Sequence, residues 1–238
     1  MKHFYLELPG PNWFSGAEIY RRFVKSVRNP SIAVELGAWK GRSTCFMAVE
    51  IANSNAPIRF FTIDHWQGSI GEEGHDADTD KAEGRLFETF VRNTEPVASY
   101  VQAIRSDSAS AAEGFEDDSV DFLYVDASHT CEAVLRDLRA WYPKLKIGGV
   151  IAGDDWCFEN GGDHGVRRAV LLFFGQSALR LRLEPGSLPN QAWIQWSLVK
   201  KEKRPKAARS WLRILLGKLA MLRFRMRNRW APFAQGRV

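Results

Sequence analysis

Short apolar runs alternate with longer segments of helical spacing along most of the chain. The runs that predict strands cover residues 32–36, 59–63, 101–104, 120–125 and 150–152. Segments whose apolar residues recur every three or four positions predict helices over residues 15–28, 43–52, 80–93, 131–142 and 166–174. Two further runs, 179–183 and 193–199, lie on either side of the turn Pro185-Gly186 and predict a closing antiparallel strand pair.

This alternation of strand and helix predicts an α/β fold with a doubly wound, Rossmann-like and mostly parallel sheet. Ligands of such sheets bind outside the carboxyl ends of the strands. Chemically suggestive residues lie at those ends of the five predicted parallel strands: Glu35, Asp64, Asp107, Asp126 and the pair Asp154-Asp155. We therefore expect a binding site at this edge of the sheet.

Charge divides the chain into two parts. The 238 residues carry a net charge of +5, but residues 200–238 hold thirteen Lys and Arg against one acid, Glu202, a net of +12. Residues 1–199 therefore hold 20 bases and 27 acids, a net of −7. We predict one domain over residues 1–199, followed by a basic linker and helical tail over residues 200–238. The acidic domain disfavours nucleic acid as a partner.

The cysteines and the hydropathy pattern indicate a cytoplasmic protein. Cys45, Cys131 and Cys157 are odd in number and lack a C-x-x-C spacing, which excludes a disulfide scaffold and a structural zinc site. No apolar run approaches the ~18 residues that a membrane span needs, and residues 1–10 do not resemble a secretory leader. We expect a soluble protein or one bound peripherally to a membrane.

A glycine-containing loop, Glu35-Leu-Gly37-Ala-Trp-Lys-Gly41-Arg-Ser43, joins the first strand to the next helix. Glycine lets a ligand approach the backbone, and the helix N-terminus supplies free N–H groups. The third glycine of a dinucleotide fingerprint is missing, which disfavours an NAD-dependent oxidoreductase. Glu35 disfavours a pyrophosphate and favours a ligand with an ammonium group. An ordinary turn between strand and helix explains the loop equally well.

Two acids after the next strands have the positions of nucleoside-binding groups. Asp64 lies 27 residues after Gly37, where a carboxylate can accept both hydroxyls of a ribose. Asp107-Ser108 follows the third strand and could contact an adenine edge. Turn formation and helix capping are the alternatives for both acids.

Three carboxylates, Asp126, Asp154 and Asp155, follow neighbouring strands and would repel one another. A divalent cation removes that conflict, and oxygen ligands favour Mg²⁺, Mn²⁺ or Ca²⁺ over zinc. The alternative is that one acid caps a helix while Asp126 pairs with a base. His129 lies beside this cluster and is our candidate general base. We expect His65 to be a solvated loop residue.

Together these residues resemble a known family. Residues 35–43 resemble motif I of class I S-adenosylmethionine-dependent methyltransferases. The stretch from Val120 to Asp155 resembles the metal-dependent O-methyltransferases, including catechol and caffeoyl-CoA enzymes and macrocin-type enzymes that methylate sugar hydroxyls. The catechol enzymes have Lys at the position of His129 and Asn at that of Asp155, and the macrocin type shares the histidine. The likeness spans roughly residues 30–175.

The resemblance implies a role for each site residue. The methionine moiety of S-adenosylmethionine would lie at Glu35 and Gly37, and the cofactor-binding residues would include Ala38, Gly41, Ser43 and Asp126. Asp64 would bind the ribose, and Asp107 with Ser108 the adenine. Asp126, Asp154 and Asp155 would bind the cation, expected to be Mg²⁺, and His129 would deprotonate the acceptor hydroxyl. Trp66 and residues 72–80 resemble a substrate lid.

The tail predicts an amphipathic helix over residues 207–230. Its apolar stripe recurs every three or four positions, at Trp211, Leu215, Leu219, Leu222, Met226 and Trp230. Tryptophan at both ends, with many arginines, is typical of a helix in an anionic membrane interface. Docking on the chain's own domain, or on a second subunit of a homo-oligomer, is the alternative.

We therefore expect an enzyme that transfers a methyl group from S-adenosylmethionine to a hydroxyl of a sugar, glycoside or similar vicinal diol, with the aid of a divalent cation. A catechol-like small-molecule O-methyltransferase is the second hypothesis. A non-catalytic protein of the same fold, held at a membrane by its tail, is the third.

Overall fold

The computed structural model describes residues 1–69, 76–159, 164–187, 193–205 and 210–227. Within them a seven-stranded sheet has the order β3-β2-β1-β4-β5-β7-β6. Its strands are β1 (Ser31–Leu36), β2 (Ile58–Asp64), β3 (Gln102–Arg105), β4 (Val120–Val125), β5 (Leu145–Gly153), β6 (Arg182–Pro185) and β7 (Ile194–Val199). Strands β1 to β5 are parallel, while β7 is antiparallel to both β5 and β6. The predicted doubly wound sheet with a closing antiparallel pair is confirmed.

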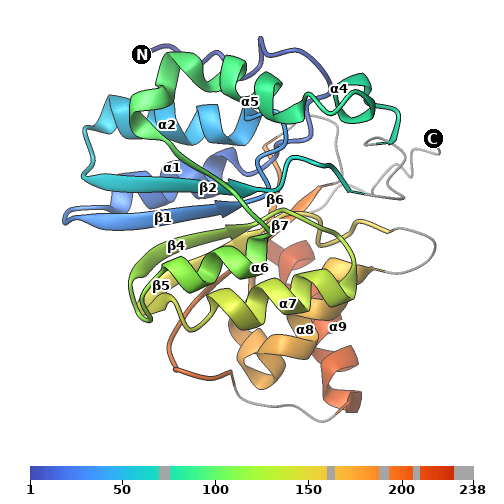
Figure 1. Ribbon diagram of the computed structural model, residues 1–238. Helices are drawn as coiled ribbons and strands as arrows, with labels where there is room; N and C mark the ends of the chain where they lie inside the picture. The colour runs from blue at the N-terminus through green and yellow to red at the C-terminus, as the bar shows by residue number, and fades with distance from the viewer. Residues whose placement is uncertain (70–75, 160–163, 188–192, 206–209, 228–238) are drawn as a thin grey trace.

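Helices cover both faces of the sheet (Figure 1). One layer contains α1 (Ala17–Ser26), α2 (Arg42–Ser54), α4 (Thr79–Ala82) and α5 (Leu86–Thr94). The other contains α6 (Ser108–Ala111), α7 (Cys131–Trp141), α8 (Gly165–Phe174) and α9 (Ser210–Arg227). Short 3₁₀ segments cover Glu95–Tyr100, Ala112–Gly114 and Gly175–Arg180.

The side-chain alternation of the strands divides the core between the two layers. In β1, Val34 and Leu36 pack in the cluster under α7 and α8. Ala33 packs in the cluster under α1 and α2. Glu35 points toward that same layer, where it accepts hydrogen bonds from Tyr20 and Thr44. These bonds explain why an acid can be the last residue but one of a strand that is buried on both faces.

Local chemistry changes three predicted boundaries. The helix expected over residues 80–93 is divided into α4 and α5, with Gly84 at φ +68° between them. Strand β5 begins five residues before the expected 150, and its register with β4 shifts at the glycine pair 148–149. The residues expected to open the strand at 179 instead end a 3₁₀ segment.

The first residues of the predicted linker belong to the packed domain. The side chain of Lys200 is 1% exposed, and its Nζ donates to the carbonyl oxygens of Tyr142, at 2.9 Å, and Leu145. It also lies 4.9 Å from the centre of the Tyr142 ring. Glu202 accepts a hydrogen bond from Arg180 at 2.7 Å. Lys200 thus connects the end of β7 to the turn between α7 and β5.

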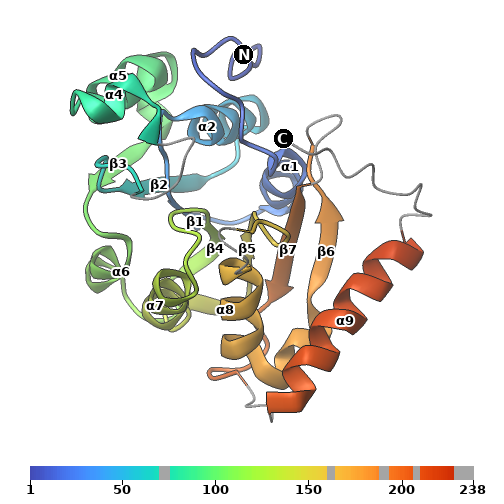
Figure 2. The same ribbon diagram turned by 90° about the vertical axis from the view of Figure 1, so that its right-hand side faces the viewer.

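Helix α9 packs on its own domain beside α8 and β6 (Figure 2). The buried residues that make this contact are Gly217, Ala220 and Phe224, spaced three and four positions apart. Leu222 and Met226, two members of the predicted stripe, are 52% and 68% exposed. Among the described residues, no helix combines the length and hydropathy that crossing a membrane requires.

The junction of α6 and α7 contains a buried acid. Asp137 is 1% exposed, and the hydroxyl of Ser108 donates to its Oδ1 at 2.5 Å. Burial raises the pKa of Asp137 to about 6, against the opposing effect of the Ser108 hydrogen bond. The indole N–H of Trp141 donates to the Ser108 carbonyl at 2.7 Å. Two side chains of α7, Asp137 and Trp141, thus hold Ser108 at the start of α6.

Replacing Lys200 by methionine should lower the free energy of unfolding by ~1–3 kcal/mol, because buried carbonyl oxygens lose their donor. Urea denaturation at neutral pH measures the change. The matched control is Lys201→Met at the exposed neighbour, which should stay within ~0.5 kcal/mol of the wild type. Equal effects of the two variants would contradict the structural role of Lys200.

Asp137→Asn should stabilise the protein at pH 7.5 but not at pH 4. The folded-state pKa of about 6 exceeds the unfolded value of ~3.9, so the wild type loses stability as pH rises between them. The variant keeps an acceptor for Ser108 and escapes this loss, which amounts to at most ~3 kcal/mol. Urea titrations at steps from pH 4 to pH 8 measure the difference, which should grow up to about pH 6 and then level off. A pH-independent difference would contradict the buried acid.

Candidate active site

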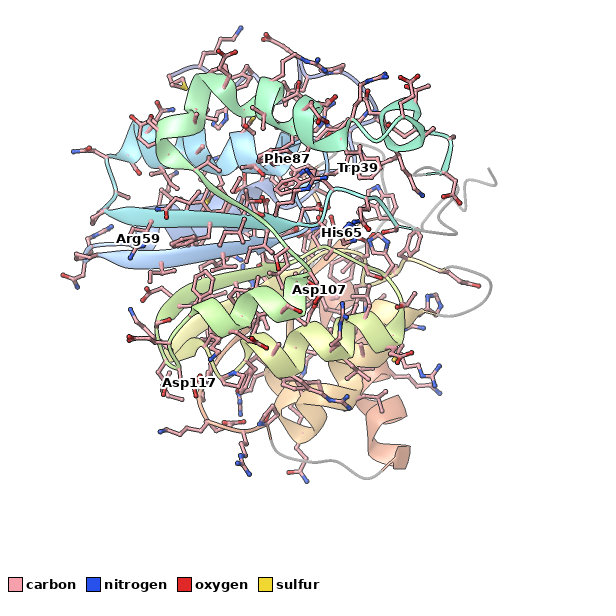
Figure 3. The ribbon with its side chains drawn as sticks, in the orientation of Figure 1. Trp39, Arg59, His65, Phe87, Asp107 and Asp117 are labelled. Atoms are coloured by element: carbon pink, nitrogen blue, oxygen red, sulfur yellow. The ribbon has the colours of Figure 1, made fainter. Side chains whose placement is uncertain are left out.

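A cavity of about 810 Å³ opens at the carboxyl ends of the parallel strands. Trp39, His65 and Asp107 mark this end of the sheet (Figure 3). The predicted site residues that line the cavity are Gly37, Ala38, Ser43, Asp64, Asp107, Ser108, Asp126, His129 and Asp155. Glu35, Gly41 and Asp154 are not among its lining residues.

The glycines of the loop after β1 have conformations that other residues rarely adopt. Gly37 has φ +89°, and a Cβ atom there would lie 2.0 Å from the Asp126 carbonyl oxygen. Gly41 has φ +85°, and its Cβ would lie 2.7 Å from Thr94 Cγ2. Gly37 thus lets the loop approach the end of β4, while Gly41 lets α2 begin against α5. The second glycine has a packing role in this structure.

Glu35 lies behind the cavity wall. Its carboxylate accepts from the hydroxyls of Tyr20 at 2.7 Å, Thr44 at 2.5 Å and Thr62 at 2.7 Å. Burial raises the pKa of Glu35, although these hydrogen bonds oppose the rise. The structure therefore places Glu35 in a closed polar network between β1, α1 and α2. Glu35 is not among the residues that line the cavity, and its contact with the methionine moiety stays a prediction.

Asp64 faces the cavity and also shapes the glycine loop. Its Oδ2 accepts from the backbone N–H groups of Ala38 and Trp39, both at 2.9 Å, and its Oδ1 accepts from that of Trp66 at 2.7 Å. One lone pair of Oδ1 remains for a hydroxyl of a ligand. The predicted ribose acid is therefore in reach of the cavity and has a turn-forming role as well.

Asp107 and Ser108 lie at the start of α6. Asp107 caps that helix by accepting from the Ser110 N–H at 3.0 Å, and Arg136 donates to its other oxygen at 2.5 Å. Burial alone would raise the pKa of Asp107, but the Ser110 hydrogen bonds and the Arg136 cation lower it. Asp107 therefore caps a helix, as the alternative prediction stated, and it also lines the cavity.

Asp126, His129 and Asp155 converge at one corner of the cavity. One ligand atom from each lies within 4.8 Å of the other two, and His129 Nε2 is 2.9 Å from Asp155 Oδ2. Burial and the nearby carboxylates of Asp155 and Asp154 raise the pKa of Asp126 well above its usual range. The two carboxylates supply oxygen atoms that fit a divalent cation, and the imidazole of His129 lies beside them.

Asp154, the third predicted cation ligand, points away from this corner. Its Oδ2 accepts from the Ser15 hydroxyl at 2.6 Å, and its Oδ1 accepts from the Asp155 N–H at 2.8 Å. Burial raises the pKa of Asp154 to about 7, with Asp155 the second cause. Asp154 thus lies outside the group that Asp126, His129 and Asp155 form, and its role as a third cation ligand stays a prediction. Asp154 also supports Asp155, whose backbone has the left-handed φ of +60°.

The segment before α1 was not expected at the site but forms one of its walls. Its lining residues are Leu8, Pro9, Pro11, Trp13 and Phe14. The guanidinium of Arg42 holds the segment by donating to the carbonyl oxygens of Tyr5, Leu8 and Gly10. These contacts join residues more than thirty positions apart and use backbone acceptors, so no side-chain motif could have indicated them.

Aromatic rings form two further parts of the wall. Phe158 lies 4.7 Å from the His129 ring and stacks at 6.3 Å with Trp193. On the other side Trp13 and Trp39 have their ring centres 5.9 Å apart. None of these four rings was predicted as a site residue. His65, predicted as a solvated loop residue, is half-exposed and also lines the cavity.

Trp66 has a different place from the one expected of a substrate lid. Its side chain is 2% exposed, packs against Phe87 and Phe90, and donates its N–H to the Trp39 carbonyl at 2.9 Å. Trp66 therefore connects α5 to the glycine loop, through its ring contacts on one side and the Trp39 carbonyl on the other. Of the predicted acidic lid over residues 72–80, residues 72–75 lie outside the described residues.

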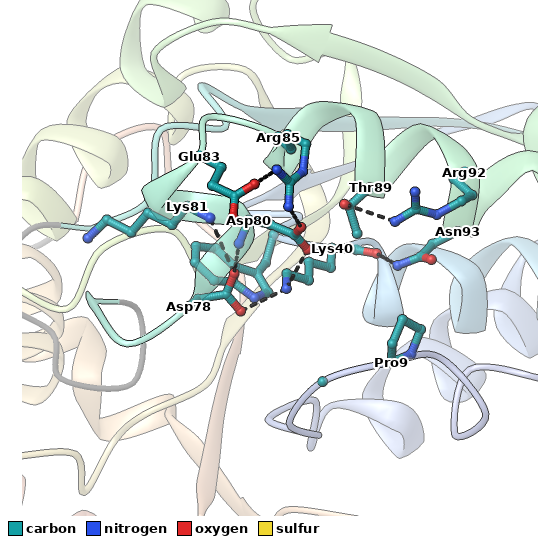
Figure 4. A network of polar contacts seen from close by, with 12 residues as sticks. Pro9, Lys40, Asp78, Asp80, Lys81, Glu83, Arg85, Thr89, Arg92 and Asn93 are labelled. Atoms are coloured by element: carbon teal, nitrogen blue, oxygen red, sulfur yellow. Dashed lines mark hydrogen bonds and ion pairs between the residues drawn. The ribbon is translucent and has the colours of Figure 1, made fainter.

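Lys40 ties the glycine loop to the described part of that acidic segment (Figure 4). Its Nζ lies 2.7 Å from Asp78 and 2.8 Å from Asp80, and its carbonyl accepts from the Asn93 side chain at 2.8 Å. Lys40 is only partly exposed, and the two acids raise its pKa against the lowering effect of burial. The loop that lines the donor side of the cavity is thus fixed from α4 and α5.

Comparison with known proteins identifies the family. A family model described as a methyltransferase domain matches residues 34–156, just over half of the chain. The uncharacterized protein y4gI of Sinorhizobium fredii is 27% identical over 131 residues, which are 53% of this chain and 13% of that protein. The chain therefore spans about one eighth of the length of this relative.

Solved structures share the fold at low sequence identity. The O-methyltransferase NovP matches with a TM-score of 0.58 and 19% identity over 79% of this chain and 80% of its own. An S-adenosylmethionine-dependent O-methyltransferase from Thermotoga maritima matches with a TM-score of 0.54 and 13% identity, over 84% and 70%. Cofactor-bound Rv0187 from MTB matches at 0.53 and 16%, over 82% and 85%. The chain belongs to the methyltransferase domain family and has the class I fold of S-adenosylmethionine-dependent methyltransferases.

Proposed function

We propose that this methyltransferase transfers the methyl group of S-adenosylmethionine to a hydroxyl of a sugar, a glycoside or a similar vicinal diol, and that a divalent cation takes part. The observation that carries the proposal is the corner formed by Asp126, His129 and Asp155. It lies in the same cavity as the glycine loop, so donor and acceptor sites adjoin. The fold relatives whose printed names include O-methyltransferase agree with oxygen as the acceptor atom.

The donor side is the part of the cavity between the ends of β1, β2 and β3. Gly37 leaves the backbone open to the ligand, and Asp64 offers an oxygen to the ribose. Ser108 lies on the same wall, where the adenine would bind. These residues bind and orient the donor, so that its methyl group lies toward the end of β4, where Asp126 is located.

The acceptor side is the corner between β4, β5 and the N-terminal segment. A bound cation would be held by Asp126 and Asp155, and it would supply the positive charge that lowers the pKa of an acceptor hydroxyl. His129 Nε2 lies 2.9 Å from Asp155 Oδ2. His129 accepts the proton from the hydroxyl as the oxygen attacks the methyl group, whose bond to sulfur breaks and releases S-adenosylhomocysteine. Holding the two reactants together in the correct geometry accelerates the displacement.

The walls of the acceptor side favour a cyclic acceptor with an apolar face. Phe158 and Trp193 stack beside His129, so a ring that presents its hydroxyls to the triad can lie against them. Sugar rings have such a face of C–H groups. A catechol would also fit this description and remains the second candidate. We expect the enzyme to act in the cytoplasm.

Removing the Asp64 carboxylate charge should weaken donor binding. Asp64→Asn replaces an oxygen that faces both the loop amides and the predicted ribose, and we expect the Kd for S-adenosylmethionine to rise ~10-fold or more, since one charged hydrogen bond is lost. Calorimetric titration measures this Kd. The control Asp117→Asn changes an exposed acid far from the cavity and should leave it unchanged (Figure 3). Unaltered binding in Asp64→Asn would exclude the ribose role.

Two substitutions separate the cation site from the general base. Asp155→Asn should abolish both Mn²⁺ binding, measured by calorimetry without acceptor, and methyl transfer to a panel of vicinal-diol glycosides and catechols. His129→Ala should retain Mn²⁺ binding while reducing transfer by ~10²–10⁴-fold. If His129→Ala loses Mn²⁺ as completely as Asp155→Asn, the histidine is a ligand and the assignment of the base is wrong. Full transfer by both variants would contradict the proposed chemistry.

A further inference from the structure

Helix α9 has apolar residues on two of its faces, and its own domain uses one of them. Gly217, Ala220 and Phe224 are buried against the domain, and a Cβ atom on Gly217 would lie 2.9 Å from Leu171. The helix is therefore already anchored. Apolar residues elsewhere on its surface are not needed to hold it there.

The outward face keeps large apolar side chains in solvent. Leu222 and Met226, one helical turn apart, are 52% and 68% exposed. Lys218 lies one turn before Leu222 and is exposed. Arg223 is exposed as well, and its guanidinium donates to the Leu179 carbonyl at 2.6 Å. Exposed apolar residues with cations beside them are the composition of a helix that lies in a lipid interface.

The charge distribution indicates which kind of surface this face would meet. From residue 203 to residue 238 the chain contains eleven Lys and Arg and no acid, so this stretch has a net charge of +11. The domain over residues 1–199 has a net charge of −7. An anionic surface attracts the basic tail and repels the acidic domain. The favoured orientation is therefore the one in which α9 faces the surface.

The position of α9 in the fold allows that orientation. Helices α4 and α5 lie on the far side of the molecule from α9 in both ribbon views (Figures 1 and 2). The acids Asp78, Asp80 and Glu83 belong to that far side. A flat anionic surface against α9 therefore does not meet this acidic segment.

We propose that the outward face of α9, defined by Lys218, Leu222, Arg223 and Met226, docks on the surface of an anionic phospholipid bilayer. The helix stays packed on the domain through Phe224 while Leu222 and Met226 enter the interface. This inference concerns where the enzyme acts and does not depend on its acceptor or its cation.

The test is co-sedimentation of the full chain with vesicles. Vesicles of equal parts phosphatidylglycerol and phosphatidylcholine should bind the wild type, and vesicles of pure phosphatidylcholine should not. The double variant Leu222→Glu/Met226→Glu should bind the anionic vesicles at least ~10-fold more weakly, because it removes buried apolar area and adds repelling charge. Added salt should weaken wild-type binding.

A matched control distinguishes the proposed face from general hydrophobicity. Val91→Glu/Ile147→Glu makes the same chemical change at two sites that are 50% and 52% exposed elsewhere on the molecule, and it should bind like the wild type. Thermal melting should show that both double variants remain folded. Equal loss in both variants, or binding to neutral vesicles, would overturn the proposal. Failure of the wild type to sediment with the anionic vesicles would also overturn the proposal. An effect of the double variant on the oligomeric state or on RNA binding alone would then indicate a different partner for this face.

Discussion

The close approach of the loop after β1 to the end of β4 determines the geometry of the whole site. The Asp126 N–H donates to the Leu36 carbonyl at 2.9 Å, and the Asp126 carbonyl occupies the place where a side chain at residue 37 would begin. Because residue 37 is glycine, the loop after β1 and the corner formed by Asp126, His129 and Asp155 share one wall. Asp64 then fixes the same loop from the other side through the Ala38 and Trp39 amides. The relative position of the loop after β1 and the corner at Asp126 therefore depends on one backbone contact.

Burying several carboxylates at one sheet edge costs free energy unless each finds a partner. Glu35 is satisfied by three hydroxyls and Asp154 by the Ser15 hydroxyl and a backbone amide. Asp126 and Asp155 are left facing the cavity, and the pKa of Asp126 is raised by burial and by its neighbours. The remaining electrostatic conflict is thus concentrated at the point where a cation or a transferred proton would relieve it.

Most of the fold and much of the site follow from local sequence patterns. Strand periodicity and the glycine loop predict the sheet, and strand ends predict that Asp64, Asp126 and Asp155 share one edge. Local sequence patterns do not predict which way a side chain at that edge points. Asp154 and Asp155 are adjacent in sequence, yet one faces Ser15 and the other His129. That choice depends on the backbone angle of Asp155 and on a serine 139 residues away.

The same limit explains what was missed at the walls and in the tail. Arg42 holds residues 5–10 through backbone carbonyls, which carry no sequence signal. In α9, the stripe of large apolar residues predicted a helix in a membrane interface, with docking on the domain as the alternative. The contact with the domain is made by Gly217, Ala220 and Phe224, which do not belong to that stripe, and the glycine allows a close approach to Leu171.

Ser15 connects the N-terminal wall to the cation corner. The Ser15 hydroxyl donates to Asp154 and accepts from the Gln195 side chain. The Ser15 carbonyl accepts from the Ser187 N–H at 2.8 Å. Asp154 in turn accepts from the amide of Asp155 and so helps to hold that residue in its left-handed conformation. The wall that carries Trp13 is therefore joined to Asp155 through two residues, Ser15 and Asp154. The fold thereby makes the shape of the acceptor side and the placement of Asp155 mutually dependent.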